Sequence, residues 1–162
     1  METLEAIRTK RAVRNFKDKP VPETILRKIV DAGRLSQSSK NTQPWTFIVV
    51  RDPDKLRQLS QCGKYAEHMA RAAFAVIIIS ETEWAFDIGQ AAAYLQLAAW
   101  DLGVSSCLVR FHDANKAKAA LNMPVEKNMD IGISFGYAAK PPRSPKLGGR
   151  RPFDQVVRWG SW

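Results

Sequence analysis

The stretch Ser36-Gln37-Ser38-Ser39-Lys40-Asn41-Thr42-Gln43-Pro44-Trp45 runs directly into the apolar segment Thr46-Phe47-Ile48-Val49-Val50. Every side chain from 36 to 43 carries a hydrogen-bond donor or acceptor. Such polarity directly before a buried-looking strand is typical of a loop that cradles a ligand. The alternative is a surface loop whose Ser and Asn side chains satisfy local backbone groups, with Pro44 setting the entry into the strand.

A second polar stretch, Lys10-Arg11-Ala12-Val13-Arg14-Asn15-Phe16, lies about one helix upstream. We expect it to be extended, and its alternation then places Lys10 and Arg14 on one side. Cations fixed on so short a segment can clamp a phosphate at one end and the polar edge of a ring at the other.

The length of 162 residues fits one domain spanning 1–162. The longest apolar run, residues 72–79, is too short to cross a bilayer, and no basic, apolar leader follows Met1. We therefore expect a soluble, cytoplasmic protein without membrane contact. Two separated cysteines and two separated histidines indicate neither a disulfide framework nor a metal site.

The net charge of +9 calls for an anionic partner. A phosphorylated cofactor and a dinucleotide co-substrate would use several of the cations. Nucleic acid is the alternative, but the chain has neither the aromatic interleaving of an RNA-binding sheet nor zinc-finger spacing.

The hydrophobic patterning predicts helices alternating with strands. The expected helices are a short one before residue 10, Glu23–Arg34, one starting at Asp52-Pro53, 65–71, 88–100 and 112–121; the expected strands are 46–50, Phe74–Ser80, 104–110 and 130–137. The apolar run Phe74–Ser80 indicates burial on both faces. The glycines at 132 and 136 indicate close packing against the last strand.

Two segments indicate a second subunit. Residues 88–100 contain no charge and are apolar nearly all round, so every face of that helix must be enclosed. The tail 139–151 has the composition of a disordered basic arm, whereas 152–159 regains apolar residues. An arm that is mobile in its middle and apolar at its end can dock on a neighbouring subunit, so we expect the two subunits to exchange their C-terminal arms.

Side-chain catalysis has no recognisable motif in this chain, which lacks Gly-x-Gly-x-x-Gly after a strand, a phosphate-binding Gly-x-x-x-x-Gly-Lys loop, Gly-x-Ser-x-Gly and His-Glu-x-x-His. If the protein is an enzyme, we expect a bound cofactor to supply the chemistry.

Taken together, 10–16 and 36–45 resemble the flavin-binding segments of the nitroreductase family of FMN-dependent oxidoreductases. There, an Arg-Arg-Ser-x-Arg-x-Phe-like stretch precedes a Ser-x-x-Asn-x-Gln-Pro-Trp-like loop. Asp87-Ile88-Gly89, Gly103-Val104-Ser105-Ser106-Cys107 and the ending 149–157 also resemble family segments, in the same order. The resemblance implies an α+β fold: a three-layer α/β/α sandwich with a mixed, mainly antiparallel sheet, in a homodimer with a domain-swapped C-terminal arm.

The resemblance also implies a set of cofactor contacts. Lys10 and Arg11 would approach the FMN phosphate and ribityl chain, and Arg14 would approach the pyrimidine end of the ring. Arg150 and Arg151 would close on the phosphate, while Ser38, Ser39 and Asn41 would bind the flavin from the opposite subunit. The backbone of Leu108, Val109 and Arg110 would face the ring and its N5. Ala12 replaces the family's usual Ser, which removes one hydroxyl from the site. Lys40, Trp84 and Phe86 are candidates for the substrate side.

The implied reaction is hydride transfer from NADH or NADPH to FMN, followed by reduction of a nitroaromatic, quinone or related small-molecule acceptor. No side-chain acid or base is needed for the hydride step, so no catalytic residue is expected. The alternatives are another reaction on the same fold, such as reductive dehalogenation or FMN fragmentation, and a non-catalytic basic binding protein.

Overall fold

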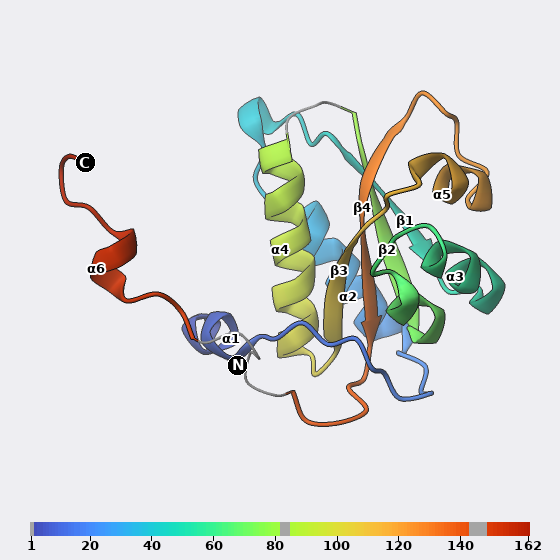
Figure 1. Cartoon of the computed structure of the whole chain (residues 1–162), viewed down its shortest axis with the longest axis horizontal. Helices are drawn as coiled ribbons and strands as arrows, with labels where there is room; N and C mark the ends of the chain where they lie inside the picture. The colour runs from blue at the N-terminus through green and yellow to red at the C-terminus, as the bar shows by residue number, and fades with distance from the viewer. Residues whose placement is uncertain (1, 82–84, 143–148) are drawn as a thin grey trace.

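A four-stranded antiparallel sheet forms the middle layer of the protein (Figure 1). The computed structural model describes residues 2–81, 85–142 and 149–162. The strands are β1 (Trp45–Val50), β2 (Phe74–Ser80), β3 (Ser105–Arg110) and β4 (Asn128–Gly136), in the order β1-β2-β4-β3. The expected mixed sheet is thus antiparallel throughout these four strands, because the one parallel pairing among the described residues is an isolated bridge between Ala12 and Ser106.

Strand β2 is buried on both faces, as its uninterrupted run of apolar residues predicts. Residues 74–79 are all buried. Phe74 stacks on Phe135 of the neighbouring strand, with ring centroids 4.7 Å apart. A strand with no solvent-facing side requires a helical layer on each side of the sheet.

One helical layer consists of α2 (Glu23–Arg34) and α4 (Ala85–Asp101), which pack on each other and on one face of the sheet. The opposite layer holds α3 (Pro53–Ser60), the 3₁₀ helix η2 (Glu67–Arg71) and α5 (Ala114–Ala120). Asp52 and Asp113 cap α3 and α5 by accepting hydrogen bonds from the amides of Lys55 and Lys116, each at 2.9 Å. The three-layer α/β/α prediction is confirmed.

The N-terminal segment continues the sheet beyond β3. Helix α1 (Thr3–Thr9) leads into an extended segment, 10–16, which makes isolated bridges from Ala12 to Ser106 and from Phe16 to Ala138. A Cβ placed on Gly136 would lie 2.9 Å from Cδ1 of Phe16, and one on Gly132 would lie 2.9 Å from the Phe111 ring. The predicted close packing at these glycines is confirmed.

Part of α4 is not enclosed within one chain. Phe86, Gly89, Ala93 and Tyr94 form an exposed stripe along a helix whose other side is buried in the core. The enclosure that the sequence predicts for every face of this helix is therefore incomplete in a single subunit.

The C-terminal segment leaves the body of the molecule and carries a short helix, α6 (Phe153–Val156) (Figure 1). In the described segment 149–162, every hydrogen bond joins residues of that same segment. Its aromatic side chains are exposed; Trp159 keeps 82% of its surface accessible. In the described ranges no helix is long and apolar enough to span a membrane.

We expect Gly136→Ala to lower the free energy of unfolding by about 1–3 kcal/mol, because the new methyl group would overpack against Phe16. Urea denaturation measures the change. Gly149→Ala is the matched control, since no atom lies within 4 Å of its added Cβ. Equal stability of both variants would contradict the assigned packing.

Candidate functional site

The basic segment 10–16 lies along the outer edge of β3. The Val13 amide donates to the Ser106 carbonyl at 3.0 Å, which fixes the segment's register on that strand. Lys10 and Arg14 both lie close enough to Cys107 to favour its thiolate, although burial is the larger effect and raises the pKa of the Cys107 thiol. Burial likewise lowers the pKa of the Lys10 ammonium. The structure thus brings Lys10 and Arg14 to one place on β3.

Beyond the bridge at Ser106, the outer edge of β3 faces no further strand among the described residues. Leu108 is 44% exposed, Arg110 is exposed, and Val109 between them is buried. This edge at Leu108 and Val109 therefore lies near the cations of 10–16, whereas the Arg110 carbonyl packs against Gly63.

A buried polar chain lies behind this edge. His68 Nδ1 is 2.8 Å from the Ser134 hydroxyl, and that hydroxyl donates to the Cys107 carbonyl at 3.3 Å. Since Ser134 has one proton to donate, His68 acts as the donor at Nδ1, and Nε2 carries the lone pair. Nε2 is buried and has no hydrogen-bond partner in the described structure.

His68 and Arg14 line the same cavity, of about 530 Å³. Its other lining residues are Lys64, Tyr65, Glu67, Ala70 and Arg71. Burial, and secondarily the Arg14 charge, lower the pKa of His68 to about 4, so the imidazole is neutral at physiological pH. Among the described residues, Arg14, Lys64 and Arg71 form no ion pair. The cavity therefore has three cations against one carboxylate, Glu67, and His68, whose buried Nε2 lacks a partner, forms part of its wall.

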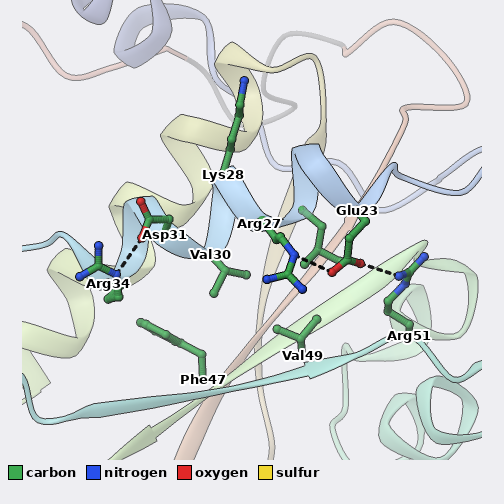
Figure 2. A pocket seen from close by; sticks show the side chains of 10 residues that line it. Glu23, Arg27, Lys28, Val30, Asp31, Arg34, Phe47, Val49 and Arg51 are labelled. Atoms are coloured by element: carbon green, nitrogen blue, oxygen red, sulfur yellow. Dashed lines mark hydrogen bonds and ion pairs between the residues drawn. The ribbon is translucent and has the colours of Figure 1, made fainter.

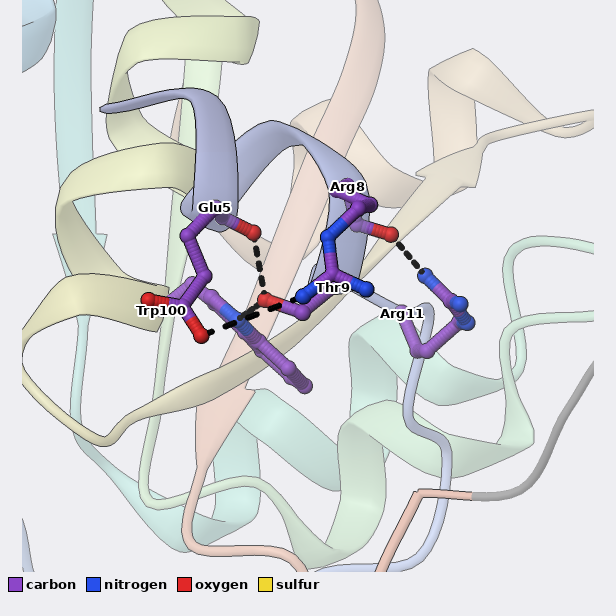
Figure 3. Close-up of polar contacts among 5 residues, drawn as sticks. All are labelled: Glu5, Arg8, Thr9, Arg11 and Trp100. Carbon is purple, nitrogen blue, oxygen red and sulfur yellow. Dashed lines mark hydrogen bonds and ion pairs between the residues drawn. The ribbon is translucent and has the colours of Figure 1, made fainter. Parts of the chain in front are cut away.

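Arg11 differs from its two cationic neighbours because its guanidinium turns back onto α1. It donates to the carbonyl of Arg8 at 2.8 Å (Figure 3) and to that of Lys10 at 2.9 Å. The indole N–H of Trp100 donates to the Thr9 hydroxyl at 3.0 Å (Figure 3). These contacts attach α1 and the start of the basic segment to the last turn of α4.

The polar loop 36–44 has an unusual backbone. It contains the 3₁₀ turn η1 (Ser39–Asn41), and Lys40, Asn41 and Gln43 have φ of 51°, 55° and 51°. Left-handed conformations cost non-glycine residues about 1 kcal/mol each or more. The loop is held by the buried Asp87 carboxylate, which accepts from the Ser39 amide at 3.1 Å, and by Ser38 Oγ, which accepts from the Gln43 amide at 2.9 Å.

The two halves of the predicted site lie at opposite ends of α4. The loop contacts Asp87 at the start of the helix, whereas Thr9, next to Lys10, contacts Trp100 at its end (Figure 1). A helix of 17 residues is about 25 Å long. One chain therefore brings Lys10, Arg14 and β3 together but keeps Ser38, Ser39 and Asn41 away from them.

The remaining predicted residues lie apart from this cluster. Arg150 and Arg151 are exposed in the C-terminal segment. Lys40 is exposed within the polar loop, and Phe86 is exposed at the start of α4. Trp84 lies outside the described residues. Ala12 sits on the bridge to Ser106.

A larger cavity, of about 720 Å³, lies between α2 and β1 and contains none of the predicted cofactor residues (Figure 2). Its apolar floor includes Val30, Phe47 and Val49. Its three arginines are held in ion pairs, because Arg27 and Arg51 share Glu23, and Arg34 pairs with Asp31 (Figure 2). The cations that line the cavity beside His68, in contrast, form no ion pair among the described residues.

The model of the nitroreductase family matches residues 7–78 and 60–137, most of the chain. A protein of Methanothermobacter thermautotrophicus, provisionally named an NADH dehydrogenase/NAD(P)H nitroreductase, is 33% identical over 113 residues, which are 65% of this chain and 59% of that protein. A protein of the same provisional name from Archaeoglobus fulgidus is 28% identical over 84% of this chain and 85% of its own length.

Among solved structures, an FMN-dependent nitroreductase from Clostridium difficile superposes with a TM-score of 0.89 at 28% identity, over 98% of this chain and 99% of that one. The chain belongs to the nitroreductase family, as its motifs indicate.

Sequence reasoning missed the residues that η2 and α4 contribute. His68, Lys64 and Arg71 were not assigned to a site, although η2 was expected as a short helix. Asp87 was noted as part of a motif without a role, and the structure shows that it anchors the polar loop. The signal for Asp87 was available, since a carboxylate directly before the uncharged stretch 88–100 needs a specific partner when it is buried.

We expect Asp87→Ala to lower the free energy of unfolding by about 1–3 kcal/mol, because the Ser39 amide loses its acceptor and the left-handed loop loses its anchor. Asp87→Asn, which retains an acceptor oxygen, is expected to cost less. Denaturant titration of both variants tests this, and an equal loss in the two would show that the carboxylate oxygen does not hold the loop.

The depressed pKa of His68 predicts a stability that falls with acidification. Between about 6.5 and about 4 the unfolded chain binds a proton that folded His68 does not, so the free energy of unfolding of the flavin-free protein decreases as pH falls through this range. His68→Gln should flatten this part of the profile. If the free energy of unfolding of the wild type and of His68→Gln changed equally with pH, the lowered pKa of His68 would be refuted.

Proposed function

We propose that this protein works as a homodimer that passes a hydride from NAD(P)H through FMN to a nitroaromatic, quinone or related small-molecule acceptor. Its class, NAD(P)H-dependent flavin oxidoreductase, follows from its family. When bound, FMN supplies the redox chemistry by accepting a hydride from the nicotinamide and passing electrons on. The chain's own residues bind and orient the reactants.

The observation that carries the proposal is the cavity shared by Arg14 and His68. The pyrimidine edge of a flavin offers carbonyl acceptors on either side of one N–H donor. Arg14 supplies positive charge where reduction leaves negative charge, and the unpartnered Nε2 of His68 supplies an acceptor for the N–H. The outer edge of β3 at Leu108, Val109 and Arg110 lies beside the same cations, and in this proposal its backbone contacts the face of the flavin ring and N5.

A second subunit completes the site in this proposal. Because Ser38, Ser39 and Asn41 lie at the far end of α4, they act on the flavin held by the partner's Lys10 and Arg14. The exposed stripe of α4 supplies an apolar surface for the subunit contact. The projecting C-terminal segment is exchanged, and it carries Arg150 and Arg151 toward the FMN phosphate beside Lys10. Arg11 joins them by giving up its contacts with the Arg8 and Lys10 carbonyls.

The acceptor binds on the open side of the ring, with Lys40, Trp84 and Phe86 contributed by the loop and by residues near the start of α4. Reductive dehalogenation and FMN fragmentation would use the same cofactor site. The two free, buried thiols Cys62 and Cys107 fit a reducing compartment, so we place the protein in the cytoplasm.

An anaerobic absorbance titration of the purified protein with FMN, followed by NADH and then NADPH, tests the proposal. We expect the flavin band near ~450 nm to persist through gel filtration of a dimer and to bleach on addition of a nicotinamide nucleotide. Arg14→Gln should weaken FMN binding roughly tenfold, through loss of a charge-assisted hydrogen bond.

Lys28→Gln is the matched control, because it removes one positive charge from the exposed side of α2. If the wild-type protein did not retain flavin, it would share the fold of its family but not the proposed flavin-dependent reaction. Salt-sensitive binding of random DNA without a chromophore would favour the basic binding protein instead.

A further inference from the structure

A second cationic cavity adjoins the proposed flavin site. It has a volume of about 610 Å³ and lies where the extended N-terminal segment passes the beginnings of α3 and β2. Ala70 and Arg71 line both this cavity and the one shared by Arg14 and His68. The two spaces are therefore neighbours, and a ligand in one lies beside a ligand in the other.

Much of the chain's net charge gathers around these neighbouring cavities. Six cations and two carboxylates line them, a net +4 of the total +9: Arg14, Lys17, Lys19, Arg51, Lys64 and Arg71 against Asp18 and Glu67. Arg51 is paired with Glu23 at 2.8 Å. Among the described residues, Lys17, Lys19 and Arg71 form no ion pair and keep their charge available to a ligand.

The two lysines are held in place by their backbone. The Lys17 amide donates to the Tyr137 carbonyl at 2.8 Å, and the Lys19 amide donates to the Lys17 carbonyl at 2.9 Å. The Lys19 ammonium also lies 4.8 Å from the centre of the Tyr137 ring. The backbone of both lysines is thus fixed beside the cavity that they line, which lowers the ordering that anion binding requires.

The wall of the cavity is apolar. Phe16 and Leu56 are buried behind it, and Pro20, Pro53 and three alanines complete the nonpolar lining. A free inorganic anion would gain nothing from such a wall, and the volume exceeds what a phosphate needs. A phosphate ester of an aromatic ring system fits this cavity better, because its phosphate can contact the lining cations while its ring packs against the apolar wall.

We propose that the cavity between Lys17, Lys19 and Arg71 binds a phosphate monoester attached to an aromatic heterocycle. The identity of the ligand rests on the proposed function. Under that function, the phosphate monoester is either the 2′-phosphoadenosine end of NADPH or a phosphorylated electron acceptor. Lys17 and Lys19 are then specificity-determining residues, because they contact a group that NADH lacks.

Calorimetric titration of the flavin-loaded protein with 2′,5′-ADP, 5′-AMP and inorganic phosphate tests the proposal. We expect 2′,5′-ADP to bind at least roughly tenfold more tightly than either control, and Lys17→Gln combined with Lys19→Gln to remove roughly that factor. Lys28→Gln, at an exposed position on α2, should leave the affinity unchanged. The variants replace exposed side chains and keep the backbone contacts that fix the turn.

Steady-state kinetics separates the two sources. A lower KM for NADPH than for NADH, with the difference lost in the double variant, supports NADPH as the source. Equal KM values with tight 2′,5′-ADP binding support the site with a phosphorylated acceptor as its ligand.

Equal binding of 2′,5′-ADP and 5′-AMP, or an affinity that the double variant does not change, would overturn the proposal, as would preferential binding of a DNA oligonucleotide. Because calorimetry does not depend on hydride transfer, loss of nucleotide binding is distinguished from failure of flavin reduction.

Discussion

Burial of β2 on both faces is the constraint on which the rest of the architecture depends. A strand whose residues 74–79 are all buried needs a neighbour on each edge and a helical layer on each face. β1 and β4 supply the edges, while α2 and α4 cover one face and α3, η2 and α5 the other. Because β4 lies between β2 and β3, β3 becomes an outer strand, and its free edge is where the cations of 10–16 gather. The core thus determines where a cofactor can lie.

The length of α4 has an equally direct effect on the site. It fastens the polar loop at Asp87 and α1 at Trp100, so the two stretches that we propose bind the cofactor are held at a distance from one another. No rotation of side chains can bring the two stretches together within one chain. The same helix exposes an apolar stripe, so the feature that separates the two stretches also provides a surface for a second subunit.

The sequence predicted the elements well where one physical signal dominated. The helix Glu23–Arg34 and the strand Phe74–Ser80 match their expected bounds, because a buried stripe or an unbroken apolar run defined each. Segment 65–71 proved to contain a shorter 3₁₀ helix, Glu67–Arg71. Lys10 and Arg14 were found from their spacing. His68, Lys17 and Lys19, which we propose as ligand-binding residues, were not, because their positions depend on contacts with Ser134 and Tyr137, far away in the chain.

The left-handed residues of the loop 36–44 restrict how this segment can vary. Lys40, Asn41 and Gln43 are exposed, and exposure alone suggests that almost any residue is tolerated there. Their backbone angles admit glycine, asparagine and aspartate readily but strongly disfavour valine, isoleucine and threonine. The repertoire of side chains that mutation can present from this loop is therefore limited by the backbone, and diversification of its chemistry is confined to a few residue types.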